Sequence, residues 1–230
     1  MPVASETIFW TRDFSAAARA PRALVLLADV DDPALRGLTS LPPKPEDLAR
    51  ASAYRDARRG YFLARRALMR QLVARRLGCA AEAVTIAVDA AGAPCLGSAT
   101  NGPELFVSIA RRGALAVLAI APRPIGVDLE LLGPPEAIPT AVLHDAEAQH
   151  LAPMDAVAQH RAFLEIWTLK EAYLKALRTG LTREPAEIEV RREKAQIRLY
   201  DRGRPVVPAT CESRRETFGG KTVVAACVML

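Results

Sequence analysis

A break near the middle of the chain limits the folds open to this sequence more than any other feature. Residues 104–120 form two apolar runs around an Arg-Arg-Gly turn, which predicts a β-hairpin. The segment "APRPIG" that follows carries two prolines, which stop regular strand pairing. On each side of this break, helix patterns precede strand patterns. We therefore expect an α+β fold with segregated helices, divided into residues 1–121 and residues 122–230.

Composition places the chain among globular proteins. Half of its 230 residues are apolar, which is enough for a sizeable hydrophobic core. No run of 18 or more apolar residues occurs, and the N-terminal residues lack the order of a signal peptide, so we expect a cytoplasmic protein with no membrane partner. The four cysteines are widely spaced and have no neighbouring histidine, and we expect reduced core thiols.

The positive charge is concentrated in one segment. The chain carries a net charge of +5, and nine arginines stand against the single acid Asp56 between Arg50 and Arg76. Apolar residues at helical spacing run through this segment to Gly78, which predicts an amphipathic helix with a basic face. Such a face attracts nucleic acid, phosphorylated small molecules or acidic proteins, or it is simply solvated.

The strand pattern "IGVDLE" holds two carboxylates two residues apart. In an extended chain Asp128 and Glu130 share one face, where like charges repel unless water or a cation separates them. Mg²⁺ is the obvious cation, because it prefers hard oxygen ligands. The alternative is a sheet edge with two solvated acids.

The segment from Arg161 to Arg178 reads as a helix whose polar stripe includes Glu171 and Lys175, with Lys170 on the apolar side. The stripe is either a solvated i,i+4 pair or a ligand-binding face. Together with the strand acids and the basic segment, it describes a magnesium-pyrophosphate site. A magnesium-dependent nuclease or phosphohydrolase and a basic nucleic-acid-binding protein are the rival interpretations.

Two segments carry a family resemblance. "GVDLE" (126–130) and "WTLKEAYLKA" (167–176) resemble the paired signature of the 4'-phosphopantetheinyl transferases, a G-[IV]-D-x-E strand before a [FW]-x-x-K-E-[AS]-x-x-K helix. The length is similar to that of the surfactin-type branch, which implies a monomer of two pseudo-symmetric halves, each a small antiparallel sheet packed with helices. The implied reaction transfers the phosphopantetheine arm of coenzyme A to a carrier-protein serine and releases adenosine 3',5'-bisphosphate.

The resemblance also implies roles for single residues. Asp128, Glu130 and Glu171 would ligate Mg²⁺, or Mn²⁺, on the coenzyme A pyrophosphate, and Lys175 would bind a pyrophosphate oxygen. Lys170 would stand beside the coenzyme. Asp128, Glu171 and Lys175 are the expected catalytic residues, and either Glu171 or a metal-bound water would accept the serine proton.

In the first half, the resemblance implies coenzyme A and carrier contacts. Ser108 and Arg111 would bind the 3'-phosphate, with Arg111 where the family has His, and Arg66 and Arg59 could reach the coenzyme. The alternative is an exposed turn with solvated arginines. The expected partner is an acyl or peptidyl carrier protein of a polyketide, nonribosomal peptide or fatty acid pathway, and nucleic acid is not expected.

Overall fold

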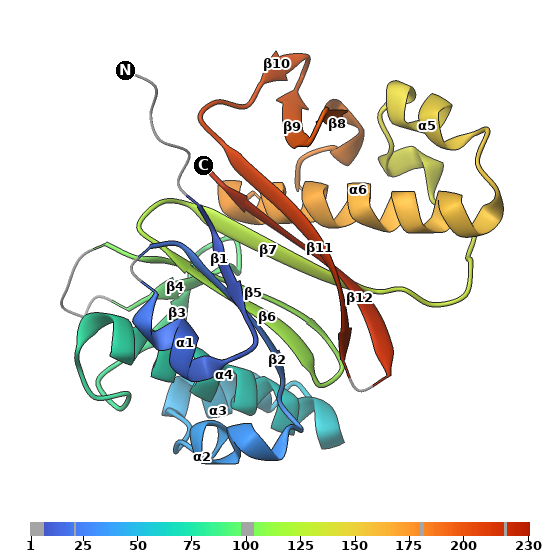
Figure 1. Cartoon of the computed structure of the whole chain (residues 1–230). Coiled ribbons are helices and arrows are strands. Elements are labelled where there is room, and N and C mark those ends of the chain that lie inside the picture. Colours follow the sequence, from blue (N-terminus) through green and yellow to red (C-terminus); the bar gives the residue numbers. More distant parts are fainter. Residues whose placement is uncertain (1–6, 21, 98–103, 180–181, 219) are drawn as a thin grey trace. The chain divides into compact units, whose positions relative to one another are not determined.

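The computed structural model describes residues 7–20, 22–97, 104–179, 182–218 and 220–230. These residues form two compact units, one ending at Arg123 and the other running from Pro124 to Leu230 (Figure 1). Each unit combines helices with small, mainly antiparallel sheets, which confirms the α+β class. The separate roles assigned to residues 1–121 and 122–230 stay a prediction.

The N-terminal unit is built around a four-stranded sheet of order β1-β2-β6-β5. Its elements are β1 (Phe9–Thr11), α1 (Phe14–Arg19), β2 (Leu24–Asp29), η1 (Pro33–Leu35), α2 (Arg36–Thr39), α3 (Pro45–Ala51), α4 (Asp56–Leu77), β3 (Ile86–Val88), β4 (Pro94–Leu96), β5 (Phe106–Arg112) and β6 (Leu115–Ala121). The predicted hairpin is β5 and β6, which turn at Gly113 with a φ of 60°. β1 pairs in parallel with β2, and the other pairs of this sheet are antiparallel.

Helix α4 supplies much of this unit's core. Leu68, Met69 and Leu72 are at most 1% exposed and belong to one cluster with Leu26 and Leu118 of the sheet. The helix ends as predicted at Gly78, whose φ of 67° is the left-handed conformation that glycine adopts without strain.

The predicted basic face of α4 is only partly correct. Arg65, Arg66 and Arg70 are buried, and each donates to a backbone carbonyl from a distant part of the chain. A hydrogen bond to a carbonyl offsets part of the cost of burying a guanidinium, and Arg66 also pairs with Asp47. One third of the arginines in the segment therefore build the interior instead of a solvated face.

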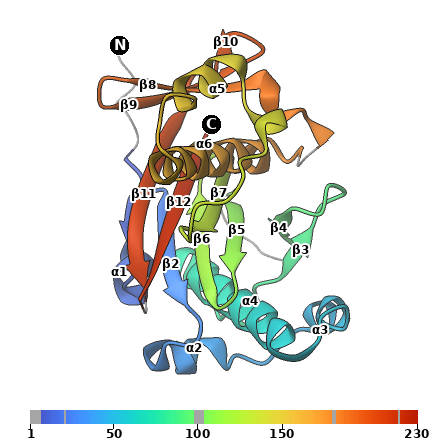
Figure 2. The same ribbon diagram turned by 90° about the vertical axis from the view of Figure 1, so that its right-hand side faces the viewer.

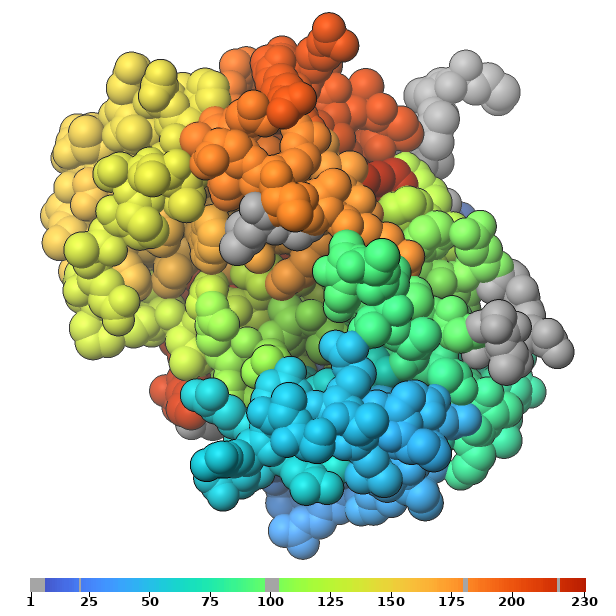
Figure 3. Space-filling view, turned by 180° about the vertical axis from the view of Figure 1, so that it is seen from behind, coloured from blue at the N-terminus to red at the C-terminus, as the bar shows by residue number. Residues whose placement is uncertain are grey.

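The C-terminal unit contains two three-stranded sheets of order β11-β12-β7 and β10-β9-β8. Its elements are β7 (Ile125–Leu131), η2 (Thr140–Val142), α5 (Asp145–Leu151), α6 (Ala156–Leu177), η4 (Pro185–Glu187), β8 (Ile188–Glu193), β9 (Gln196–Asp201), β10 (Arg204–Pro205), β11 (Thr210–Phe218) and β12 (Lys221–Met229). Helix α6 packs across β7 and β12 (Figure 2), and α5, in yellow, lies at the surface (Figure 3).

Two helix starts differ from the sequence prediction. The helix expected from Arg161 begins at Ala156, because Asp155 caps it by accepting from the Ala158 N–H at 2.9 Å. The helix expected from Ala141 begins at Asp145, after a short 3₁₀ turn. No described helix is long and apolar enough to cross a membrane.

The cysteines are all free, as expected, but they are not all core thiols. Cys227 is buried in β12, Cys95 and Cys211 are half-buried, and Cys79 is exposed. Cys79 lies just beyond Gly78, where α4 has ended and the chain is solvated.

Candidate functional site

Helix α6 lies so close to β7 that Gly126 has no room for a side chain. A Cβ at this position would lie 1.9 Å from the carbonyl oxygen of Ala172 and 2.5 Å from the amide nitrogen of Ala176. Backbone therefore packs on backbone, which only glycine permits. This contact brings the polar stripe of α6 beside the carboxylates of β7.

The strand pairing shows which side chains of β7 face the helix. Asp128 is paired with Ala226 of β12, and Ala226 packs in one cluster with α6. Residues opposite each other in an antiparallel pair point to the same face, and that face repeats every second residue. Asp128 and Glu130 therefore share one face, as the sequence predicted, and that face is turned toward α6.

Asp128 and Lys175 form the centre of this face. The ammonium of Lys175 lies 2.5 Å from Oδ1 of Asp128. The Asp128 side chain is 10% exposed and that of Lys175 is 31% exposed, so the pair is buried at its acid end and open at its basic end. Oδ2 of Asp128 is buried and has no hydrogen-bond partner among the described residues.

The remaining acids of the predicted set are half-buried. Glu130 is two residues beyond Asp128 on the strand, and Glu171 is one helical turn before Lys175. Their carboxylate oxygens are the ligands that Mg²⁺ prefers. Oδ2 of Asp128 is a buried acceptor that a cation would satisfy. Across the described residues, however, no group of three or more Asp, Glu, His or Cys side chains converges to hold a metal ion. Magnesium therefore stays a proposal.

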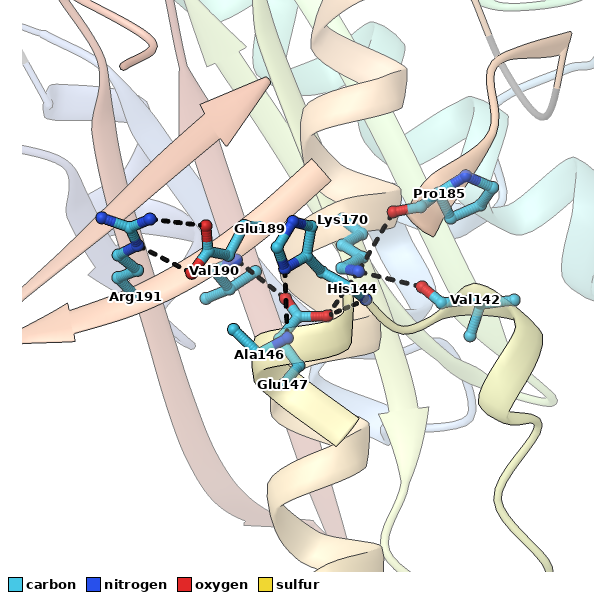
Figure 4. A network of polar contacts seen from close by, with 9 residues as sticks. All are labelled: Val142, His144, Ala146, Glu147, Lys170, Pro185, Glu189, Val190 and Arg191. Carbon is cyan, nitrogen blue, oxygen red and sulfur yellow. Dashed lines mark hydrogen bonds and ion pairs between the residues drawn. The ribbon is translucent and has the colours of Figure 1, made fainter. Parts of the chain in front are cut away.

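Lys170 does not stand beside this face as predicted. Its ammonium lies 2.6 Å from Oε2 of Glu147 and donates to the carbonyls of Val142 at 2.9 Å and Pro185 at 3.0 Å (Figure 4). An ammonium has three N–H donors, and these partners occupy all of them. Burial lowers the pKa of Lys170, and the hydrogen bond to Glu147 opposes that shift. Lys170 therefore leaves the proposed set of coenzyme-binding residues.

The N-terminal unit contains a second candidate site, a pocket of about 180 Å³ rich in arginine. Arg111 and Arg66 line it, as do Gly92 and Pro94. Two aromatic rings also line it, Tyr54 and Phe62, with their centroids 5.4 Å apart. The remaining lining residues are Arg50, Arg65, Val88 and Ile109.

Two of the predicted coenzyme-binding residues do not line this pocket. Arg59 is exposed on α4, outside the lining residues. Ser108 is 4% exposed on β5, one residue before Ile109 of the lining. Side chains alternate along a strand, so Ser108 points to the face opposite Ile109 and Arg111. The structure thus brings Arg66 and Arg111 together and leaves Ser108 and Arg59 apart from them.

Arg65 is a functional candidate that the sequence did not single out. It is 3% exposed and donates to the carbonyl of Gly113 at 3.0 Å, and it makes no ion pair within the described chain. Burial, together with the charge of Arg111, lowers the pKa of Arg65 to about 10, so it remains a cation at neutral pH. A buried cation without a carboxylate partner, at a pocket lined by other arginines, favours an anionic ligand. Nothing in the sequence separates Arg65 from its neighbours.

Comparisons with known proteins agree with the C-terminal geometry. Residues 124–227 match the family model of the 4'-phosphopantetheinyl transferase superfamily. The chain is 31% identical over 150 residues to the 4'-phosphopantetheinyl transferase HetI of Nostoc sp., an alignment that covers 63% of each protein. It is 29% identical over 167 residues to slr0495 of Synechocystis sp., provisionally named a 4'-phosphopantetheinyl transferase, covering 70% of this chain and 67% of that protein.

Solved structures give partial superpositions. The holo-(acyl-carrier-protein) synthase of Bacillus anthracis, solved in complex with CoA (3',5'-ADP), is 22% identical with a TM-score of 0.34, covering 46% of this chain and 94% of that one. The Thermotoga maritima synthase is 17% identical with a TM-score of 0.34, covering 46% and 62%. By the matched segment and the two relatives, this chain is similar to the 4'-phosphopantetheinyl transferase superfamily.

Proposed function

We propose that the protein transfers the 4'-phosphopantetheine arm of coenzyme A to a serine of an acyl or peptidyl carrier protein, releasing adenosine 3',5'-bisphosphate. The observation that carries this proposal is the packing of α6 on β7 at Gly126, because it sets both parts of the family signature on one face. We further propose the surfactin-type branch and a monomeric state, on the length and two-part pattern of the chain. We also propose a cytoplasmic location.

The C-terminal face would hold the pyrophosphate end of coenzyme A. Asp128, Glu130 and Glu171 are the residues that would hold Mg²⁺ there, and the ion would neutralise the negative charge of the pyrophosphate. Lys175 is bonded to Asp128 at 2.5 Å and is 31% exposed. A phosphate oxygen could replace Asp128 as its partner without loss of a charge-assisted hydrogen bond.

The reaction also needs a proton acceptor for the serine hydroxyl. Glu171 is the half-buried carboxylate on the same helical stripe as Lys175, and we assign it this role. In phosphoryl transfer, positioning and charge neutralisation supply most of the rate, and no covalent protein intermediate is required. The chain's own contribution would thus be to orient the pyrophosphate and to take one proton.

The arginine pocket of the N-terminal unit would bind the 3'-phosphate. Arg111 lies with its guanidinium carbon 5.7 Å from the ring centroid of Tyr54, and Arg66 lies 5.9 Å from that of Phe62. A guanidinium binds phosphate through two parallel hydrogen bonds, and an aromatic ring offers a surface for a base. Arg65 would add a buried positive charge to the same pocket.

The test is the intact mass of an apo carrier protein incubated with coenzyme A, Mg²⁺ and this enzyme. We expect the carrier to gain one phosphopantetheine arm, and to gain nothing when coenzyme A or the carrier's serine is removed. A phosphohydrolase or nuclease would instead cleave the coenzyme or nucleic acid and leave the carrier mass unchanged. An unchanged mass with carriers from all three pathways would contradict the proposal.

A further inference from the structure

The ion pair between Lys170 and Glu147 is a closed network within the C-terminal unit. Oε2 of Glu147 accepts from the His144 N–H at 2.8 Å as well as from Lys170, and Oε1 accepts from the Val190 N–H at 2.8 Å (Figure 4). The side chains of Lys170 and Glu147 are 1% and 3% exposed. Both ends of the pair are therefore fully bonded inside the protein.

This network connects α6 to four other segments. Through Lys170 it reaches η2 at Val142 and η4 at Pro185, and through Glu147 it reaches the start of α5 and strand β8. Glu147 also completes the N-terminal cap of α5, with His144 in the capping position. A single lysine thus fixes one side of α6 against segments that lie up to 28 residues away in sequence.

The other side of α6 is fixed by the contact at Gly126. At about 3.6 residues per turn, Glu171 lies about 100° round the helix from Lys170 in one direction and about 100° from Ala172 in the other. Ala172 and Ala176 are the residues whose backbone packs on Gly126. The stripe of Glu171 and Lys175 therefore lies between two anchors, and rotation of the helix would disturb both.

We propose that Lys170 is a positioning residue: paired with Glu147, it fixes the rotation of α6 and so directs Glu171 at the carrier's serine, without itself contacting coenzyme A. Glu147 has the same function from the other end of the pair. This inference rests on the proposed transfer reaction for its kinetic readout. The two lysines of the signature then have different roles: Lys170 stabilises the position of α6, and Lys175 binds the coenzyme.

The first experiment compares Lys170→Met with Lys175→Met, using coenzyme A affinity measured by calorimetry and the kcat and KM of carrier modification. We expect Lys170→Met to lower kcat by about tenfold or more while the coenzyme A Kd changes by less than about twofold. We expect Lys175→Met to weaken coenzyme A binding by about tenfold. If Lys170→Met weakens coenzyme A binding as much as Lys175→Met does, Lys170 contacts the coenzyme and the inference is overturned.

The second experiment asks whether Lys170 and Glu147 act as one unit. Glu147→Gln should lower kcat without changing the coenzyme A Kd. The double variant Lys170→Met with Glu147→Gln should have a kcat less than about twofold below that of Lys170→Met, because both changes break the same network. Independent, multiplying losses would overturn the inference. Wild-type enzyme that neither binds coenzyme A nor transfers its arm would refute the proposed function itself, which separates the two failures.

Stability is controlled by a paired apolar variant. Lys170→Met leaves Glu147 as a buried charge without its cationic partner, so the double change Lys170→Met with Glu147→Leu removes both charges and roughly keeps the volume. We expect the double variant to fold, as judged by its thermal melting, and to retain the loss in kcat. A folded double variant with normal kcat would overturn the inference. Failure of both variants to fold would also overturn it, because the pair would then determine the fold itself.

Discussion

Helices α4 and α6 are each 22 residues long and each carries buried cations, yet they use them differently. In α4 the buried arginines donate mainly to backbone carbonyls, and Arg66 also pairs with Asp47 at 2.6 Å. In α6 a single buried lysine pairs with Glu147, and a separate half-buried stripe faces β7. The comparison shows that the partners supplied by other segments determine whether a charged helix residue stabilises the fold or faces a binding site.

The largest effect should come from the packing that brings α6 onto its strand. Gly126→Ala places a Cβ 1.9 Å from a backbone oxygen that cannot move without shifting the helix, so we expect a loss of about 3 kcal/mol or more in unfolding free energy. The matched change on α4, Gly60→Ala, meets nothing within 4 Å, and should stabilise the protein by about 0.5–1 kcal/mol. Urea unfolding measures both, and equal effects would contradict the close contact.

Next in size is the dependence of transfer on Mg²⁺ and on Asp128, the acid of β7 that faces α6. A chelator should abolish carrier modification and Mg²⁺ should restore it, and Asp128→Asn should lower the rate by about 100-fold or more. The same variant should cost only about 1 kcal/mol in unfolding free energy, since Lys175 is 31% exposed and can turn to water. Near-normal turnover of Asp128→Asn with Mg²⁺ present would refute the assignment of Asp128.

A smaller, selective effect is expected at the pocket beside α4. Arg111→Ala should raise the KM for coenzyme A by about tenfold with little change in kcat, because it removes binding to the 3'-phosphate alone. Dephospho-coenzyme A, which lacks that phosphate, should be used almost as well as before. Arg59 is an exposed arginine of α4 outside the pocket, so Arg59→Ala is the control. It should leave the KM for coenzyme A and the KM for dephospho-coenzyme A unchanged. Equal losses with both donors would show that Arg111 does not read this phosphate.

The smallest effect concerns thiol reactivity. Cys79 is exposed just beyond the end of α4 and should react first with a maleimide. Burial raises the pKa of Cys211 to about 12 and also raises that of Cys227, so both remain protonated thiols in the folded protein at neutral pH. Peptide mapping after brief labelling should find Cys79 modified and Cys227 unmodified, with transfer activity unchanged. Rapid labelling of Cys227 would mean that β12 opens readily.

Local patterns were enough to predict much of this fold. Hydrophobic spacing and Gly78 defined α4, and the apolar runs around Gly113 defined the β5–β6 hairpin. Strand alternation correctly placed Asp128 and Glu130 on one face. The same alternation along β5 places Ser108 and Arg111 on opposite faces of the strand, so the expectation that both bind one phosphate conflicts with strand geometry.

The remaining features depend on partners that are distant in sequence. Lys170 is satisfied by Val142, Glu147 and Pro185, and no local pattern indicates that these meet at one ammonium. Strand β11, Thr210–Phe218, carries four charged residues and resembles a solvated loop until β12 pairs with it along its length. Tertiary contacts therefore determine which charged side chains are buried and which polar segments form strands.

The most direct test of the central claim uses two glutamates of α6. Glu171→Gln and Glu165→Gln are the same isosteric change on one helix, but Glu171 lies on the stripe with Lys175, whereas Glu165 pairs with Arg192. Intact-mass measurement of an apo carrier should show complete modification by Glu165→Gln and none by Glu171→Gln in the time that wild-type enzyme needs to finish. Equal modification by the two variants would contradict the claim that this face of α6 performs the transfer.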